Sequence, residues 1–122
     1  MGILRTNPDF WKELDSLIFS SEIKIDRPKG SVHPRYKEII YPLDYGYLAN
    51  TTSPDGDGID VWLGSLPEKK LGAILINADS VKRDSEIKLL IGCTGAETEV
   101  IYDFYNRYPS LKGLLVFREE NE

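Results

Sequence analysis

The stretch YPLDYGYLANTTSPDGDGIDVWL, residues 41–63, decides how the rest of the chain is interpreted. Within six residues its central turn carries three aspartates, Asp55, Asp57 and Asp60. Carboxylates that close repel one another unless solvent or a cation compensates their charge, and Mg²⁺ and Mn²⁺ prefer such oxygen ligands. The intervening glycines, Gly56 and Gly58, permit the positive φ angles that would turn the aspartates towards one point. The stretch therefore indicates a candidate metal site.

The same run is also compatible with a simpler structure. Asp and Gly are common turn residues, so a P-D-G-D-G run between apolar segments is typical of a β-hairpin turn. An EF-hand beginning at Asp55 does not fit, because it needs an oxygen ligand, a glycine and a glutamate where Ile59, Asp60 and Leu66 stand. A dinucleotide-binding fingerprint needs a third glycine where the chain has Val61. The run alone leaves a solvated turn and a metal site both open.

The overall composition is that of an ordinary globular protein. A length of 122 residues, with 41% hydrophobic and 29% charged residues, predicts one domain over residues 1–122. The net charge of −5 argues against a nucleic-acid partner. There is no apolar run of about 18 residues and no apolar signal region, so we expect no membrane partner and a cytoplasmic location. The single cysteine, Cys93, lies in an apolar run that predicts a buried, inert thiol.

The run D-G-D-G-I-D-V, preceded by Y-P-x-D-Y-G-Y, closely resembles the signature of the soluble family I inorganic pyrophosphatases. The run I-D-R-P-K-G-S, residues 25–31, resembles the first active-site strand and turn of that family. The resemblance is specific over residues 25–63 and looser over residues 73–117. It implies an α+β, mainly β fold, a small OB-like closed β-barrel with an N-terminal and a C-terminal helix. It also implies metal-dependent hydrolysis of a phosphoanhydride, with inorganic pyrophosphate as the expected substrate.

Periodicity predicts the secondary structure around these motifs. Asn7 and Pro8 predict the start of a helix of about ten residues with one apolar face. The apolar runs 71–78 and 87–93 flank a charged turn and predict a β-hairpin. Residues 96–108 predict the C-terminal helix, and the closing run LLVFRE predicts a last strand.

The resemblance assigns roles to particular residues. The implied cofactor is Mg²⁺, with Mn²⁺ as the alternative ion. Its implied ligands are Asp55, Asp60, Asp79, either Asp84 or Glu86, and Asp26 where the family has a glutamate. The implied catalytic residues are Asp57, which would accept the proton of the attacking water, and Tyr45. The implied substrate-binding residues are Lys29, Arg35, Lys88 and Tyr108. Structural interpretations stay open beside these roles: a solvated surface arginine at position 35, and a solvated turn of mixed charge around residues 79–86.

The chain departs from the family pattern at two points. Only three residues, E-I-I, separate the R-Y-K segment from Tyr41, where the family usually carries a hairpin that delivers an arginine to the phosphate. Pro109 follows Tyr108, where the family usually has a lysine. Two phosphate-binding cations are therefore expected to be missing. We assign no role to the single histidine, His33, which we expect to be exposed in a turn.

These departures leave several functions open. The first hypothesis is hydrolysis of pyrophosphate, and a variant of it is hydrolysis of a substituted, nucleotide-like diphosphate that enters through a more open wall. The second is a metal- or phosphate-binding module with weakened catalysis, and the third is a structural domain with a solvated acidic turn. The expected partners are a small-molecule diphosphate and further copies of the chain in a homo-oligomer.

Overall fold

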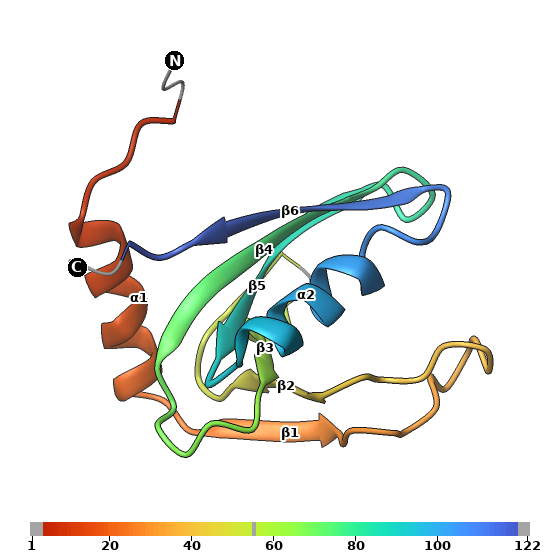
Figure 1. The fold of residues 1–122 in the computed structure, drawn as a ribbon, viewed down its shortest axis with the longest axis horizontal. Helices are drawn as coiled ribbons and strands as arrows, with labels where there is room; N and C mark the ends of the chain where they lie inside the picture. Colours follow the sequence, from red (N-terminus) through yellow and green to blue (C-terminus); the bar gives the residue numbers. More distant parts are fainter. Residues whose placement is uncertain (1–3, 55, 120–122) are drawn as a thin grey trace.

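Figure 1 shows the computed structural model of the chain, which describes residues 4–54 and 56–119. Over these residues the chain forms two helices and six strands. In order they are α1 (Asp9–Phe19), β1 (Ile23–Arg27), β2 (Asp44–Leu48), β3 (Asp60–Leu63), β4 (Leu71–Asp79), β5 (Asp84–Ile91), α2 (Gly95–Phe104) and β6 (Leu111–Phe117). The fold is mainly β, and the N-terminal helix, the hairpin, the second helix and the last strand are confirmed.

The strands form one curved sheet in the order β1-β2-β3-β5-β4-β6. Neighbouring strands are antiparallel except β3 and β5, which run parallel. A closed barrel needs its two outermost strands to pair. Within the described residues, β1 pairs with β2 and β6 pairs with β4, and the two edge strands lie on opposite sides of the molecule (Figure 1). The sheet is open, so the predicted closed barrel is not confirmed.

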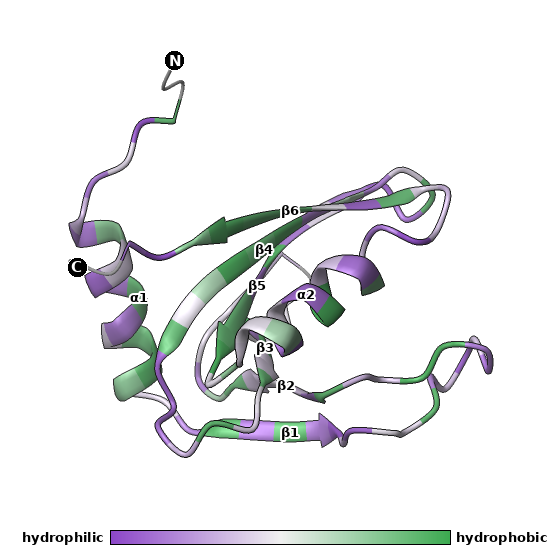
Figure 2. Cartoon of the chain, in the orientation of Figure 1, coloured by the Kyte–Doolittle hydropathy of each residue, from purple (hydrophilic) through white to green (hydrophobic). Residues whose placement is uncertain are grey.

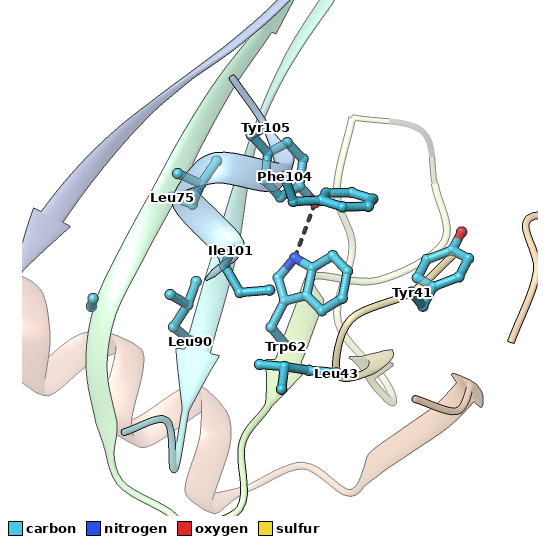
Figure 3. Packing of buried hydrophobic residues seen from close by; sticks show 9 residues of the cluster. Tyr41, Leu43, Trp62, Leu75, Leu90, Ile101, Phe104 and Tyr105 are labelled. Carbon is cyan, nitrogen blue, oxygen red and sulfur yellow. Dashed lines mark hydrogen bonds between the residues drawn. The ribbon is translucent and has the colours of Figure 1, made fainter. Parts of the chain in front are cut away.

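One face of the sheet packs against α2. Side chains at alternate strand positions point to the same face. On this face they form a buried cluster with α2, whose members include Trp62, Leu75, Leu90, Ile101 and Phe104 (Figure 3). The indole Nε1 of Trp62 donates a hydrogen bond of 3.0 Å to the hydroxyl of Tyr105, the dashed line in Figure 3. This bond satisfies two polar groups that the core would otherwise bury without a partner.

The opposite face packs against α1. Its buried cluster includes Trp11, Leu14, Leu48, Val61, Ile74 and Leu89. The N-cap of α1 is Pro8 rather than the predicted Asn7, and it makes no side-chain cap hydrogen bond. Asn7 still supports the start of the helix, because its Oδ1 accepts a hydrogen bond of 2.9 Å from the amide of Asp9. Only part of the predicted apolar face is buried, since Phe10 and Leu17 are 44% and 38% exposed. Helix α1 thus contacts the sheet mainly through Trp11 and Leu14.

Helix α2 is shorter than predicted. It begins with a capping box formed by Thr94 and Glu97 and ends at Phe104, so the predicted extension to residue 108 is wrong. After the helix, Asn106 exchanges side-chain hydrogen bonds with the backbone of Gly113 in β6, which turns the chain back towards the sheet. Neither described helix combines the length and the apolarity that a membrane-spanning segment needs.

Hydropathy changes along the central hairpin. Strands β4 and β5 are hydrophobic near α1 and hydrophilic towards the turn that joins them (Figure 2). Asn77 and Asp79 lie at this end of β4, and Asp84 and Glu86 lie opposite them on β5. The sheet therefore carries a polar end on an otherwise apolar core. Beyond the other end of β5, burial raises the pKa of the Cys93 thiol to about 12, in agreement with the predicted inert thiol.

Candidate functional site

A cavity of about 370 Å³ lies on the α2 face of the sheet, at the hydrophilic end of β4 and β5. The described charged residues that line it are Glu38, Asp79, Lys82, Asp84, Glu86 and Lys88. The aromatic residues that line it are His33, Tyr36, Tyr41, Tyr45, Trp62, Phe104, Tyr105 and Tyr108. A larger hollow of about 700 Å³ beside α1 has no predicted site residue among its described lining residues. We therefore place the candidate site in the smaller cavity.

Lys88 is the centre of the polar part of this cavity. Its ammonium donates hydrogen bonds to the hydroxyl of Tyr45 at 3.1 Å, to Asp60 Oδ2 at 2.5 Å and to Glu86 Oε1 at 3.0 Å. The side chains of Lys88, Asp60 and Glu86 are 7%, 18% and 9% exposed. The structure thus brings together one predicted phosphate-binding residue, two predicted metal ligands and one predicted catalytic tyrosine.

The pattern of strand pairing explains this cluster. In the parallel pair β3–β5, Asp60 is the register partner of Lys88, so both side chains lie on the same face. Glu86 precedes Lys88 by two residues and shares that face for the same reason. Its backbone amide donates a hydrogen bond of 2.9 Å to Oδ1 of the buried Asn77 on β4, which fixes the hairpin at this point.

Lys88 remains charged in this environment. Burial disfavours the ammonium, but electrostatic interactions with Tyr105, Tyr45 and Asp60 outweigh it and raise the pKa of Lys88 above its usual value. Burial is also the main cause of the raised pKa of Tyr45, so the Tyr45 hydroxyl is neutral near pH 7 and accepts a hydrogen bond from Lys88. The site therefore holds a permanent positive charge between two carboxylates.

Three further predicted residues line the cavity without joining this cluster: Asp79, Asp84 and Tyr108. Asp79 Oδ1 accepts hydrogen bonds of 3.0 Å from the backbone amides of Val81 and Lys82, so this carboxylate closes the hairpin turn. Asp84 lies 3.8 Å from the ammonium of Lys82, which is exposed. The two aspartates are register partners across β4 and β5.

Other predicted residues lie elsewhere. Four described residues, all exposed, are not among those that line the cavity: Asp26, Lys29, Arg35 and Asp57. Asp55 lies outside the described residues. The predicted backbone of the acidic turn is confirmed, because Gly56 and Gly58 have φ angles of +87° and +97°. The roles of all these residues stay predictions.

His33 is the residue whose surroundings the sequence did not reveal. It is half-buried rather than exposed, and its Nδ1 accepts hydrogen bonds from the backbone amides of Arg35 at 3.0 Å and Tyr36 at 3.1 Å. These bonds require an unprotonated Nδ1. Its ring is parallel to that of Tyr41, with centroids 6.1 Å apart, and 5.2 Å from that of Tyr36. The sequence signal for this aromatic contact was the short spacing between His33 and the tyrosines Tyr36 and Tyr41.

Donor chemistry decides whether these residues suit a divalent metal ion. Asp60 and Glu86 offer carboxylate oxygens, which hard cations prefer, and they are already gathered around one cation, Lys88. No group of three potential metal ligands is assembled within residues 4–54 and 56–119. Asp60 and Glu86 therefore offer the type of donor atom that Mg²⁺ and Mn²⁺ prefer, but as a pair of carboxylates rather than a set of three. Asp55 lies outside the described residues.

Comparison with curated proteins finds inorganic pyrophosphatases. That of Campylobacter jejuni is 28% identical over 100 residues, which cover 75% of this chain and 53% of the relative. That of Corynebacterium glutamicum is 38% identical over 61 residues, which cover 48% of this chain and 38% of the relative. The chain thus spans about half the length, or less, of the curated relatives it matches. No family model matches it.

Solved structures share the fold. An inorganic phosphatase from Anaplasma phagocytophilum superposes with a TM-score of 0.54 at 15% identity, covering 78% of this chain and 81% of that one. The inorganic pyrophosphatase of Helicobacter pylori superposes with a TM-score of 0.52 at 16% identity, covering 83% and 84%. At these identities the likeness concerns the fold alone. The sequence matches make this chain similar to inorganic pyrophosphatases, and the solved structures show that it shares their fold.

Proposed function

We propose that the chain hydrolyses a phosphoanhydride, with inorganic pyrophosphate as the first substrate to test and a divalent metal ion, Mg²⁺ or Mn²⁺, as the cofactor. The observation that carries this proposal is the buried cluster of Lys88, Asp60, Glu86 and Tyr45. A cation held among carboxylates and a tyrosine hydroxyl in a cavity combines groups that bind phosphate oxygens with groups that bind metal.

The charge of the cavity supports a requirement for metal. Its described lining residues include four carboxylates and two lysines, and Asp60 adds a further carboxylate through its contact with Lys88. This surplus of negative charge repels a diphosphate anion unless cations compensate it. A bound divalent ion would supply that compensation and would also lower the pKa of a bound water.

Lys88 has to exchange partners in order to bind a phosphate. An ammonium has three donor protons, and Tyr45, Asp60 and Glu86 occupy one each. A phosphate oxygen can therefore bind Lys88 only when one of these acceptors leaves. A metal ion that drew Asp60 or Glu86 away would free one donor of Lys88 for the substrate. In this proposal metal and substrate binding are linked through Lys88.

The remaining roles follow the resemblance. Asp55, Asp60, Asp79 and Asp84 or Glu86 would hold the metal, with Asp26 as an additional ligand. Asp57 would accept the proton of the attacking water, and Tyr45 and Tyr108 would contact phosphate oxygens. Lys29 and Arg35 would add positive charge from the connection 28–43. Charge stabilisation of this kind commonly supplies most of the rate of such reactions.

The test is release of phosphate from pyrophosphate in the presence of Mg²⁺ or Mn²⁺, measured for the wild type and for Asp57→Asn. We expect metal-dependent release by the wild type and a loss of at least about a hundredfold in the variant, as for general bases elsewhere. Asp103→Asn is the matched control, because Asp103 is an exposed aspartate on α2 outside the cavity lining.

Two results would contradict the proposal in different ways. A wild type that binds metal but releases no phosphate would favour the alternative of a metal- or phosphate-binding module. Equal activity of Asp57→Asn and Asp103→Asn would remove Asp57 as the proton acceptor. The single domain over residues 1–122, the homo-oligomer and the cytoplasmic location remain predictions.

A further inference from the structure

The cavity offers more surface than inorganic pyrophosphate can use. Its volume of about 370 Å³ lies within the range of about 300–1,000 Å³ in which drug-sized organic ligands bind. Pyrophosphate consists of phosphorus and oxygen alone and has no apolar surface. A bound metal ion, Lys88 and the hydroxyls of Tyr45 and Tyr108 suffice to hold a diphosphate in the function proposed above. The rings of His33 and Tyr36, which also line the cavity, are left without a role in its recognition.

Part of this aromatic lining is not core packing. Trp62 and Tyr105 are fully packed, but Tyr36 is 49% exposed, and His33 and Tyr108 are only half-buried. The two backbone amides that bind Nδ1 of His33 hold its ring in one orientation beside Tyr36. Exposed, oriented rings of this kind are platforms on which a planar ring can stack.

We propose that the aromatic part of the cavity holds the planar ring of a substituted diphosphate, and that nucleoside diphosphates are the substrate class of this chain. This inference rests on the function proposed above. The diphosphate would lie at Lys88, and the ring would stack on Tyr36 beside His33. Water adds to the terminal phosphorus and the bridging P–O bond breaks. The products are a nucleoside monophosphate, which keeps the bridging oxygen, and inorganic phosphate, with release of a proton.

Binding of non-hydrolysable analogues in the presence of Mg²⁺ tests the inference without relying on turnover. Calorimetry would compare α,β-methylene-ADP with methylenediphosphonate, which carries the same two phosphorus groups without the nucleoside. We expect the nucleoside analogue to bind about tenfold more tightly, the effect of stacking one base on an aromatic side chain. Tyr36→Ala should abolish most of this preference, whereas Tyr36→Phe, which keeps the ring, should retain it.

The matched control is Tyr102→Ala, which removes a tyrosine that is 38% exposed on α2 and is not among the described residues lining the cavity. It should leave the preference unchanged. Equal or tighter binding of methylenediphosphonate, or a preference that survives Tyr36→Ala, would overturn the nucleoside class while leaving metal-dependent hydrolysis of pyrophosphate intact. Absence of metal-dependent hydrolysis of both pyrophosphate and ADP would instead refute the proposed function, and this inference with it.

Discussion

Replacing Lys88 by methionine removes the cation that Asp60 and Glu86 share. Methionine keeps most of the volume of the lysine stem, so the main loss is the charge and its hydrogen bonds. The side chain of Lys88 is 7% exposed, and those of its two carboxylate partners are 18% and 9% exposed. Breaking a buried ion pair by removing one partner costs about 3–5 kcal/mol, because the remaining charge stays buried without compensation.

This loss is large enough to measure by thermal unfolding. For a chain of this length, a loss of about 3–5 kcal/mol lowers the melting temperature by roughly 10–20 °C. The assay is circular dichroism at pH 7 in the presence of a chelator. Lys82→Met is the matched control, because the pair of Lys82 with Asp84 spans 3.8 Å and its side chains are 71% and 33% exposed. The control should change stability by no more than about 0.5 kcal/mol.

Addition of Mg²⁺ to the same variants extends the test to the metal. In the Lys88→Met variant the two carboxylates have no cation, so a divalent ion should bind them without displacing an ammonium. We expect Mg²⁺ to raise the melting temperature of Lys88→Met more than that of the wild type. A melting temperature of Lys88→Met equal to that of Lys82→Met would refute the reasoning, because the carboxylates would then need no compensation.

Three further substitutions test other parts of the fold. Tyr105→Phe should cost about 1–3 kcal/mol in urea unfolding, because it leaves the indole N–H of Trp62 buried without an acceptor. Glu97→Ala should cost a similar amount, because its carboxylate accepts hydrogen bonds from the backbone amides of Thr94, at the start of α2, and of Ser65, after β3; an unchanged midpoint would show that water replaces the carboxylate. Burial and nearby cations lower the pKa of His33 from its ordinary value of 6.5. The unfolded chain therefore binds this proton more readily, so the stability that neutral His33 contributes should be complete above pH 6.5 and be lost as the pH falls through the lowered pKa. His33→Asn keeps an acceptor for the turn and should flatten this part of the pH profile.

The sequence predicted the elements of the site better than their arrangement. The acidic run that contains Asp60 was predicted to be a turn between apolar segments, and the apolar run 87–93 placed Lys88 in a strand. Local patterns cannot show that the strands of these two residues, β3 and β5, run side by side and parallel. That neighbourhood depends on the strand order, and it decides that Asp60 meets Lys88 rather than only the other aspartates of its turn.

What the sequence missed depends on contacts between distant segments. His33 looked like an exposed turn residue, because nothing local shows that its ring packs on Tyr41 and that its Nδ1 binds two backbone amides. The predicted helix ran past Phe104, because the apolar spacing continues to Tyr108 while the turn is made by hydrogen bonds to β6. The predicted closure of the barrel would require the edge strands β1 and β6 to pair, and local periodicity carries no information on that pairing.

The resemblance predicts that two phosphate-binding cations are missing, and the lining of the cavity also lacks positive charge along the connection 28–43. From this connection, the described residues that line the cavity are aromatic, apolar or acidic, and none is an arginine or a lysine. Lys88 cannot replace the lost charge, because Asp60 and Glu86 already neutralise it. In the function proposed above, a diphosphate in this cavity would depend on metal to compensate its charge, and an attached planar ring would gain further affinity from the aromatic side chains. We accordingly expect affinity for a diphosphate to fall steeply without metal, and recognition of an attached ring to depend on the connection 28–43, which carries Tyr36 and His33.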